Sequence, residues 1–300
     1  MRRDTAAVRL PAAIAIGVLV WSIAFQPPPA NAGGTVTPEL VQVIDTSQLS
    51  TPIPDPSGVA FRNGRLLIAD SEVDESPRLY EGRNVFEVTT DGRLEGGFRT
   101  TRFTDEPVGL AVAGQTMYFC DDNRDEIFVL RPGSDGRYGT RDDDVTSFDT
   151  RKFGSRDPEG IAFGRRRLFI VDGAGEEVYV LRRGRNRVFD GVAPAGDDKV
   201  RHFDIQQHGM VEPEGIEFDR QAGTLLISSV RRAADLIEVT LGGRLETVID
   251  GSELRIISAA GLARGPSSDG NGVSLYIADR GVDNGTDAEE NDGKIYEIRV

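Results

Sequence analysis

Two short apolar runs joined by a polar turn recur along most of this chain. In PEGIAFGRRRLFIVDG, which begins at Pro158, the runs GIAF and RLFIVD flank a turn of glycine and arginine. Equivalent segments begin at Pro56, Pro107, Pro213 and Ala259, so successive copies start 51, 51, 55 and 46 residues apart. Short apolar runs bounded by turn residues, with no helical period between them, are typical of β-strands. A regular period of this length indicates a repeat architecture.

Each copy predicts more than a hairpin, because a third apolar run follows the first two and four copies add a fourth. The fifth copy ends at Val300 without its fourth strand, whereas the segment 40–46 (LVQVIDT) is a strand with no partner nearby in sequence. We therefore predict an all-β fold, a five-bladed β-propeller with four-stranded antiparallel blades. Strand 40–46 would complete the last blade and close the ring, which leaves no open sheet edge. Six blades are the alternative, although no residues remain for a sixth.

The first 32 residues do not fit the repeat. Three arginines precede an apolar run from Leu10 to Phe25, and Ala-Asn-Ala at 30–32 fits a cleavage site, as in secretory signals. The apolar run is short for a membrane helix. We expect 1–32 to be a cleaved signal peptide and 33–300 to be a single propeller domain without a membrane span. The protein would then be secreted, to the extracellular space, the periplasm or the cell surface.

Acidic residues outnumber basic ones, 49 to 35, and the formal net charge is −14. Loss of residues 1–32 would remove three arginines and one aspartate, which makes the charge −16. Such a protein repels nucleic acid and anionic membranes, so we expect no nucleic-acid partner and favour cations or basic partners. The one cysteine, Cys120, lies in an apolar strand, where we expect a small buried hydrophobe. We expect a monomer.

Acidic residues gather where the first strands start and the second strands end. In antiparallel blades these points share one face beside the axis, so their side chains should crowd one mouth of the central channel. Glu159 and Glu214, between Pro and Gly, have no evident turn function and should face the axis. Convergent carboxylates bind hard cations such as Ca²⁺. The predicted metal-ligating residues are Glu159, Glu214, Asp157, Glu212, Asp172 and Asp121. For the strand-end aspartates, turn capping is the alternative.

Three insertions are also rich in acidic residues. The loops 132–150 and 189–205 share a spacing of Asp and Gly, join third to fourth strands, and should lie on the face opposite the mouth. Their candidate ligands are Asp135, Asp142, Asp144, Asp190, Asp197 and Asp198. An insertion in the last blade should overhang the mouth and offers Asp283, Asp287, Glu289 and Asp292. Ca²⁺ could stiffen these loops; solvated turns, or disorder without the ion, are the alternatives.

The Pro-x-Gly strand, the Gly/Asn turn and the L-Y/F-I-A/V-D strand resemble the NHL-repeat propellers and the related gluconolactonase and senescence-marker-protein propellers. The resemblance covers essentially all of 33–300 and implies the fold. For the lactonase branch it also implies a divalent cation held by Glu, Asn and Asp at the starts of inner strands, where Glu159 and Glu214 stand here. The other repeats have Ser57, Val108 and Ala260 at this position, so the family's Asn and Asp are missing. NHL relatives more often present the mouth to proteins or other ligands.

Motifs of several other chemistries are missing from the sequence. It has no G-x-S-x-G elbow, Walker A loop, Cys/His zinc spacing or G-x-G-x-x-G before a helix, and we expect no organic cofactor. His208, in the segment leading to the mouth, is the one candidate general base. Two functions remain: a secreted binding propeller with Ca²⁺-stabilised loops and an acidic mouth that receives a small molecule or protein, and a metal-dependent hydrolase of lactones or esters. Because the Asn and Asp ligands of the lactonase branch are missing, we favour the binding function over the hydrolase.

Overall fold

The computed structural model describes residues 33–73, 78–230, 235–282 and 290–300. The expected signal peptide and three of the candidate ligands, Asp283, Asp287 and Glu289, lie outside the described residues. In the described ranges, no helix is long and apolar enough to cross a membrane.

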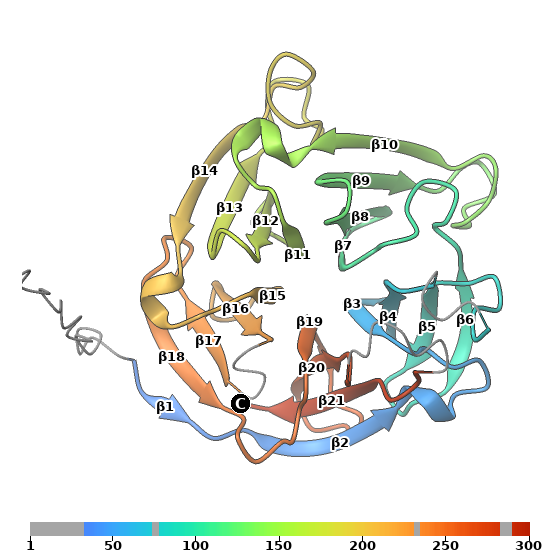
Figure 1. Cartoon of the computed structure of the whole chain (residues 1–300), viewed down its shortest axis with the longest axis vertical. Helices are drawn as coiled ribbons and strands as arrows, with labels where there is room; N and C mark the ends of the chain where they lie inside the picture. Colours follow the sequence, from blue (N-terminus) through green and yellow to red (C-terminus); the bar gives the residue numbers. More distant parts are fainter. Residues whose placement is uncertain (1–32, 74–77, 231–234, 283–289) are drawn as a thin grey trace, which may run out of the picture.

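The strands form five sheets arranged as the blades of a propeller (Figure 1). The first blade contains β3 (Pro56–Arg62), β4 (Arg65–Asp70), β5 (Val85–Thr89) and β6 (Leu94–Phe98). The second contains β7 (Gly109–Ala113), β8 (Thr116–Asp121), β9 (Glu126–Arg131) and β10 (Asp144–Asp149). The third contains β11 (Pro158–Gly164), β12 (Arg167–Asp172), β13 (Glu177–Arg182) and β14 (Lys199–Asp204).

The remaining two blades join the ends of the chain to the repeat. The fourth contains β15 (Pro213–Asp219), β16 (Thr224–Ser229), β17 (Asp235–Val239) and β18 (Leu245–Asp250), and the short β1 (Thr35–Val36) runs parallel to β18. The fifth contains β19 (Ala259–Pro266), β20 (Val273–Asp279), β21 (Lys294–Arg299) and β2 (Glu39–Asp45). Three single 3₁₀ turns, η1 (Thr46–Gln48), η2 (Thr150–Phe153) and η3 (Gln206–His208), follow outer strands.

Ring closure occurs through pairing between the two ends of the chain. β2 runs antiparallel to β21, with Val43 opposite Tyr296 and Ile44 opposite Ile295. In Figure 1 the blue N-terminal strand accordingly lies beside the red C-terminal one. The five-bladed propeller predicted from the repeat, and its closure by the N-terminal strand, are confirmed.

The Pro-x-Gly motif explains why the inner strands can crowd around the axis. A β-carbon at Gly160 would lie 2.2 Å from the carbonyl oxygen of Glu214 in the next blade, and one at Gly215 would lie 2.1 Å from that of Ala260. Only glycine fits such backbone approaches. The motif also forms a bulge in β11, because the register shifts between Pro158 and Ile161, and a bulge re-aims the neighbouring side chains.

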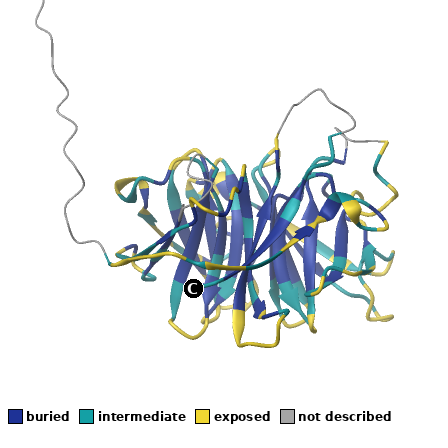
Figure 2. Ribbon diagram, turned by 90° about the horizontal axis from the view of Figure 1, so that it is seen from below, coloured by how far each residue is buried: buried dark blue, intermediate teal, exposed yellow. Residues whose placement is uncertain are grey.

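The core lies between blades, where apolar faces of adjacent sheets meet. Phe169 stacks on Phe218 with ring centroids 5.9 Å apart, which joins the third and fourth blades. Tyr118 of β8 meets Phe189, from the loop of the third blade, edge to face at 5.8 Å. Cys120 is fully buried and burial raises the pKa of its thiol, so it packs as a small hydrophobe. In Figure 2 the strands seen from the side are mostly buried, whereas the exposed residues lie mainly in the loops at the two faces.

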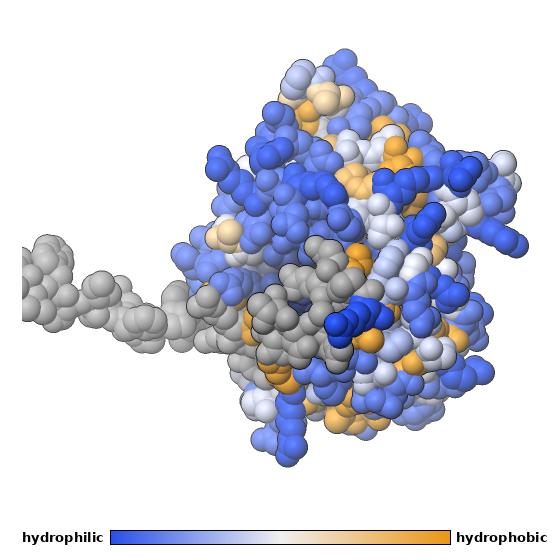
Figure 3. Space-filling view, turned by 45° about the vertical axis from the view of Figure 1, so that its right-hand side comes forward, coloured by the Kyte–Doolittle hydropathy of each residue, from blue (hydrophilic) through white to orange (hydrophobic). Residues whose placement is uncertain are grey.

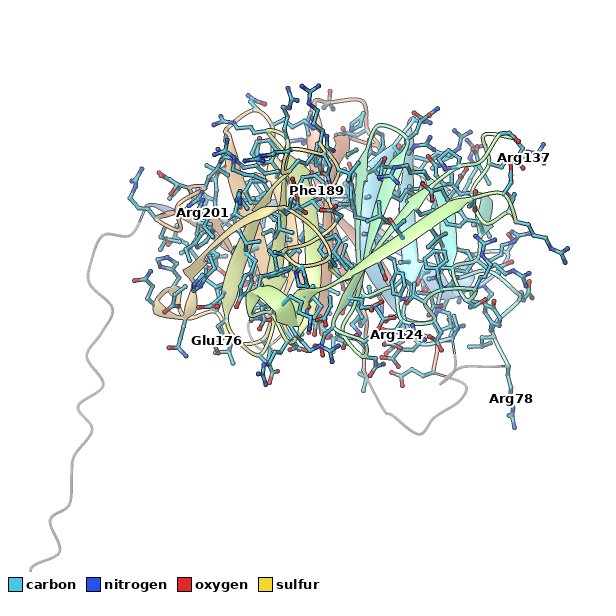
Figure 4. All side chains as sticks on the ribbon, turned by 90° about the horizontal axis from the view of Figure 1, so that it is seen from above. Arg78, Arg124, Arg137, Glu176, Phe189 and Arg201 are labelled. Carbon is cyan, nitrogen blue, oxygen red and sulfur yellow. The ribbon has the colours of Figure 1, made fainter. Side chains whose placement is uncertain are left out.

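Two faces of the disc can now be defined. The mouth face carries the starts of the inner strands and the ends of the second strands. The turn face, opposite to it, carries the tight turns that join these strands, such as 164–167. In Figure 4, Arg124 and Glu176 lie on the mouth face, at the lower side, and Arg137 lies on the turn face.

Candidate functional site

The mouth of the central channel is formed by two repeated positions. One is the residue between Pro and Gly at the start of an inner strand, where β11 supplies Glu159 and β15 supplies Glu214. The other position directly follows the end of the second strand of a blade. Asp122 follows β8, Gly173 follows β12 and Arg280 follows β20.

Three carboxylates converge at this mouth. Asp122, Asp157 and Glu159 each place one oxygen within 4.8 Å of the others, although they come from two different blades. The Oδ1 atom of Asp122 is buried and accepts no hydrogen bond from the described residues. At Gly173 a β-carbon would lie 2.8 Å from Oδ2 of Asp157, so the missing side chain leaves the carboxylates their space. The group offers hard oxygen ligands in a half-buried site, as a divalent cation requires.

Electrostatics disfavour full ionisation of this group. Burial raises the pKa of Asp122 and of Asp157, and Asp122 further raises that of Asp157. Burial is also the main cause that raises the pKa of Glu159 well above its usual range, followed by the negative charges of Glu214 and Asp122. Like charges held close in a poorly solvated site retain protons unless a cation compensates them.

Glu214 completes the site as the partner of Glu159. Burial raises the pKa of Glu214, whereas the positive charge of Arg280 and a hydrogen bond from Glu159 lower it. Burial thus raises the pKa of both glutamates, and the negative charge of Glu214 raises that of Glu159 further. The ionisation of one therefore depends on the ionisation of the other.

Arg280 is the basic side chain of the mouth. Its Nε donates to Oδ1 of Asp55 at 3.1 Å and a second nitrogen donates to Glu72. Asp55 is held in turn by the hydroxyl of Ser71, 3.0 Å away. Burial works against the charge on Arg280, but Asp55, Glu214 and Glu72 outweigh it and raise the pKa of the guanidinium. One wall of the mouth is therefore a largely buried ion-pair network in which one guanidinium pairs with two carboxylates.

Two of the predicted ligands, Asp121 and Asp172, have structural contacts instead. Asp172 accepts hydrogen bonds from the backbone N–H groups of Arg156, Asp157 and Gly175, at 2.8, 3.1 and 2.5 Å. Asp121 is fully buried and accepts from the hydroxyl of Thr104 at 2.7 Å and from the backbone and guanidinium of Arg124. These oxygens hold the loops between strands and blades.

The other candidates near the mouth lie outside the carboxylate group. Glu212 precedes Pro213 with a left-handed backbone, φ 51°. Asp292 accepts from the N–H of Val282 at 3.3 Å. His208 does not join the group either, since its Nε2 donates to the carbonyl oxygen of Gly243 at 2.8 Å.

The two outer loops differ in how they use their aspartates. In the loop of the third blade, Asp190, Asp197 and Asp198 bring oxygens within 4.8 Å of one another. Asp198 is buried, which raises its pKa to about 6, although it accepts from three backbone N–H groups.

The loop of the second blade is held by its own contacts: Asp142 accepts from Thr140 and Ser134, which lower its pKa to about 2. There Asp135 accepts from the N–H of Arg137, and Asp144 pairs with Arg131.

Sequence reasoning missed Asp122 and Arg280. At the ends of the second strands it took Asp121 and Asp172 as candidates, with turn capping as the alternative, whereas Asp122 and Arg280 each lie one position after a strand end. That later position holds Ser71, Asp122, Gly173, Val230 and Arg280 in the five blades. Because this position varies in an otherwise regular repeat, its variation could have marked it as a functional position.

Comparisons with known proteins show the fold and no family. No family model matches the sequence, and no curated protein sequence is similar to it. Among solved structures, the glutaminyl cyclase of Myxococcus xanthus superposes with a TM-score of 0.57 at 12% identity, covering 89% of this chain and 97% of that one. A luciferin-regenerating enzyme has a TM-score of 0.51 at 13% identity, covering 88% and 95%. Both are enzymes by name, and at this identity the similarity shows a shared β-propeller architecture.

Proposed function

We propose that this protein is a binding propeller whose acidic mouth holds a divalent cation, with Ca²⁺ the best match, and receives a small molecule or partner there. The observation that carries the proposal is the convergence of Asp122, Asp157 and Glu159, with one buried oxygen of Asp122 left without a donor. Carboxylate oxygens in a semi-flexible loop setting are the ligands that Ca²⁺ prefers. A ligand with carbonyl or carboxylate oxygens would complete the coordination shell.

The N-terminal features extend this proposal. The arginines, apolar run and Ala-Asn-Ala of residues 1–32 support a cleaved signal peptide, a secreted protein and a single domain over 33–300. The negative net charge supports a role without a nucleic-acid partner. The surface is mostly hydrophilic, with apolar residues in separate patches on the side shown in Figure 3, which supports a monomer.

A second candidate, a metal-dependent hydrolase of lactones or esters, is favoured by the buried pair Glu159 and Glu214, whose pKa values are raised by burial. A glutamate whose pKa is raised by burial is suited to accept a proton from a reacting water. Glu214 would be this base, and Arg280 beside it would stabilise its charged form. A bound cation would supply carbonyl polarisation and a more acidic water. The same mouth could therefore support binding alone or binding with hydrolysis.

Thermal unfolding tests the cation site. The melting temperature should rise in Ca²⁺ relative to chelator, by roughly 5–10 °C at a hundredfold excess over Kd, since ligand binding to the native state adds about 2.7 kcal/mol. The double variant Asp122→Asn/Glu159→Gln should lose this shift. Asp190→Asn/Asp197→Asn, in the outer loop, is the matched control and should keep it. Loss of the shift in the control alone would place the cation in the outer loop and reject the mouth.

Turnover separates the two functions. A panel of lactones and aryl esters is assayed with the parent protein in Ca²⁺, Mg²⁺, Mn²⁺ and Zn²⁺, and with Glu214→Gln. Hydrolysis that disappears in Glu214→Gln, while the cation-dependent melting shift persists, establishes the hydrolase. A parent that binds the cation and turns over none of the panel supports the binding protein.

A further inference from the structure

A pocket on the turn face is lined almost entirely by arginine. Its lining residues are Arg165, Arg166, Arg167, Arg182, Arg183 and Arg187, together with Gly184. Two turns of the third blade and the ends of β12 and β13 contribute them. Figure 4 shows Phe189 and Arg201, which border this region, on the upper side of the disc, away from the mouth. In a chain with a net charge of −14, such a concentration of positive charge requires an explanation.

The register of the third blade sets cations opposite one another. Arg167 of β12 pairs with Arg182 of β13, which pairs on its other side with Lys199 of β14. Like charges directly opposite across a sheet are destabilising. At the equivalent position of the second blade, Arg131 faces Asp144 and forms an ion pair at 3.1 Å. The third blade therefore replaces a neutral pair by a row of positive charges.

The described part of the chain offers the lining arginines no carboxylate partner. Among the residues that the structure describes, none of the six forms an ion pair. The nearby acidic residues turn to the backbone instead: Asp198 accepts from the N–H of Gly184 at 3.2 Å, and Asp197 accepts from that of Arg185 at 2.6 Å. Burial lowers the pKa of Arg167, and the charges of Arg182, Arg201 and Arg165 lower it further.

One lining arginine is held in place before any ligand arrives. The guanidinium of Arg183 lies over the ring of Phe189, 4.6 Å from its centroid, and 5.7 Å from that of Phe163. Its Nε is buried and has no hydrogen-bond partner among the described residues. A guanidinium fixed by two aromatic rings loses little conformational freedom when its other nitrogens bind an anion.

We propose that this pocket binds a compact, multiply charged oxyanion, a phosphate or sulfate group carried by a small soluble molecule. Guanidinium forks match the oxygens of such a group and bind them through paired, charge-assisted hydrogen bonds. An extended polyanion or an anionic membrane would in addition meet the negative charge of the rest of the protein, which disfavours both. The site lies on the face opposite the acidic mouth and is independent of the cation proposed there.

The experiment uses inorganic phosphate, sulfate and tripolyphosphate as probes, with KCl adjusted to constant ionic strength. Each probe should raise the melting temperature, tripolyphosphate most, and calorimetric titration should give saturable binding. The variant Arg165→Gln/Arg167→Gln/Arg182→Gln should bind tripolyphosphate at least about tenfold more weakly. Without the probes it should be as stable as the parent or more stable, because mutual repulsion is removed.

The matched control is Arg93→Gln/Arg137→Gln/Arg244→Gln, which removes the same charge from three exposed arginines that do not line the pocket. It should keep parent affinity for every probe. Vesicles of phosphatidylglycerol, with phosphatidylcholine vesicles as reference, form a second arm and should not bind the protein. Binding to these vesicles that is lost in the pocket variant would identify a lipid headgroup as the source of the phosphate. Failure of all probes, or equal weakening in the control, overturns the proposal.

Discussion

Asp121 and Asp122 are neighbours in sequence and opposites in environment. Asp121 ends β8, is fully buried and has hydrogen-bond donors for both oxygens. Asp122 faces the mouth, where one buried oxygen has no donor and burial raises its pKa. A single step along the chain thus separates a carboxylate that holds the scaffold together from one that is left for a ligand.

The other blades repeat this division. Asp172 and Asp279 bind backbone N–H groups, and the residues that follow them, Gly173 and Arg280, shape the opening. The strand-end position stays the same because the turn it caps stays the same, whereas the next position differs from blade to blade. The repeat is therefore constant at the strand-end position, which bonds to the backbone, and varies at the next position, which faces the channel.

The largest effect is expected from removal of a strand-end carboxylate. Asp172→Ala removes a buried carboxylate that accepts three hydrogen bonds from backbone N–H groups, which should lower the free energy of unfolding by about 3–5 kcal/mol. Guanidinium chloride denaturation measures it. Asp204→Ala is the control, since Asp204 is exposed and caps one N–H, of Gln206; about 1 kcal/mol is expected. Equal losses in the two variants would contradict the division drawn here.

A smaller loss of stability is expected when the guanidinium of Arg280 is removed. Arg280→Gln removes the guanidinium that pairs with Asp55 and Glu72 in a site where both are mostly buried, at a cost of about 2–3 kcal/mol. The pKa of Glu214 should rise further, because Arg280 lowers it. Denaturation gives the first effect and pH titration of the variant the second.

Arg124→Gln provides the comparison for Arg280. Arg124 also pairs with two aspartates, Asp105 and Asp121, but its side chain is 43% exposed. Solvent screens the pair with Asp105, and the buried Asp121 keeps two other hydrogen-bond donors, so about 1 kcal/mol should be lost. A loss as large as that of Arg280→Gln would show that burial does not set the strength of these networks.

The architecture could be predicted from the sequence because the apolar pattern and the turn residues of each repeat mark its strands and turns. Apolar alternation defines strands, and the missing fourth strand of the last repeat pairs with the only unpartnered one, so the five blades and their closure followed. The glutamates between Pro and Gly were placed at the mouth for the same reason. Which strand-end residues reach the opening depends on where each strand bulges and turns, and that was not visible in the pattern.

The partners of charged residues were equally beyond sequence reasoning. Arg280 lies more than two hundred positions from Asp55 and Glu72, and only ring closure brings them together. The arginine pocket depends on strand register, because a shift of one residue would separate Arg167 from Arg182. The residues of both features can be read from the sequence, but their contacts cannot.

The pH dependence of stability should be of intermediate size. The native pKa values of Glu159 and Glu214 are raised, and that of Asp70 is raised to about 8 by burial and by Asp55. The native state then binds more protons than the unfolded state above pH 4.5, so stability is full below that pH and falls as pH rises. In chelator, Asp70 alone should lower the free energy of unfolding by roughly 3 kcal/mol from pH 5.5 to pH 8, and the two glutamates should add to the decrease.

Ca²⁺ should change this profile, because a cation bound at the mouth replaces the protons. With Ca²⁺ the decrease should shrink or reverse, since deprotonation then favours binding of the ion to the native state. Glu159→Gln should flatten the profile in chelator. A parent protein whose stability in chelator rises steadily over this pH range would show that the mouth carboxylates are ionised and well solvated.

The smallest effect on stability is expected at Asp122, and it tests the comparison with Asp121 most directly. Asp122→Asn removes a charge that raises the pKa of Glu159, and no hydrogen bond to its Oδ1 is lost, so stability in chelator should change by less than about 1 kcal/mol. The Ca²⁺-dependent melting shift should nevertheless disappear. Asp121→Asn, one position earlier, should show the reverse: a loss of about 2 kcal/mol or more through its buried contacts, with the shift retained. If both substitutions destabilised equally and both kept the Ca²⁺ shift, side-chain direction at the strand end would not distinguish scaffold from site, and Asp122 would belong to the scaffold.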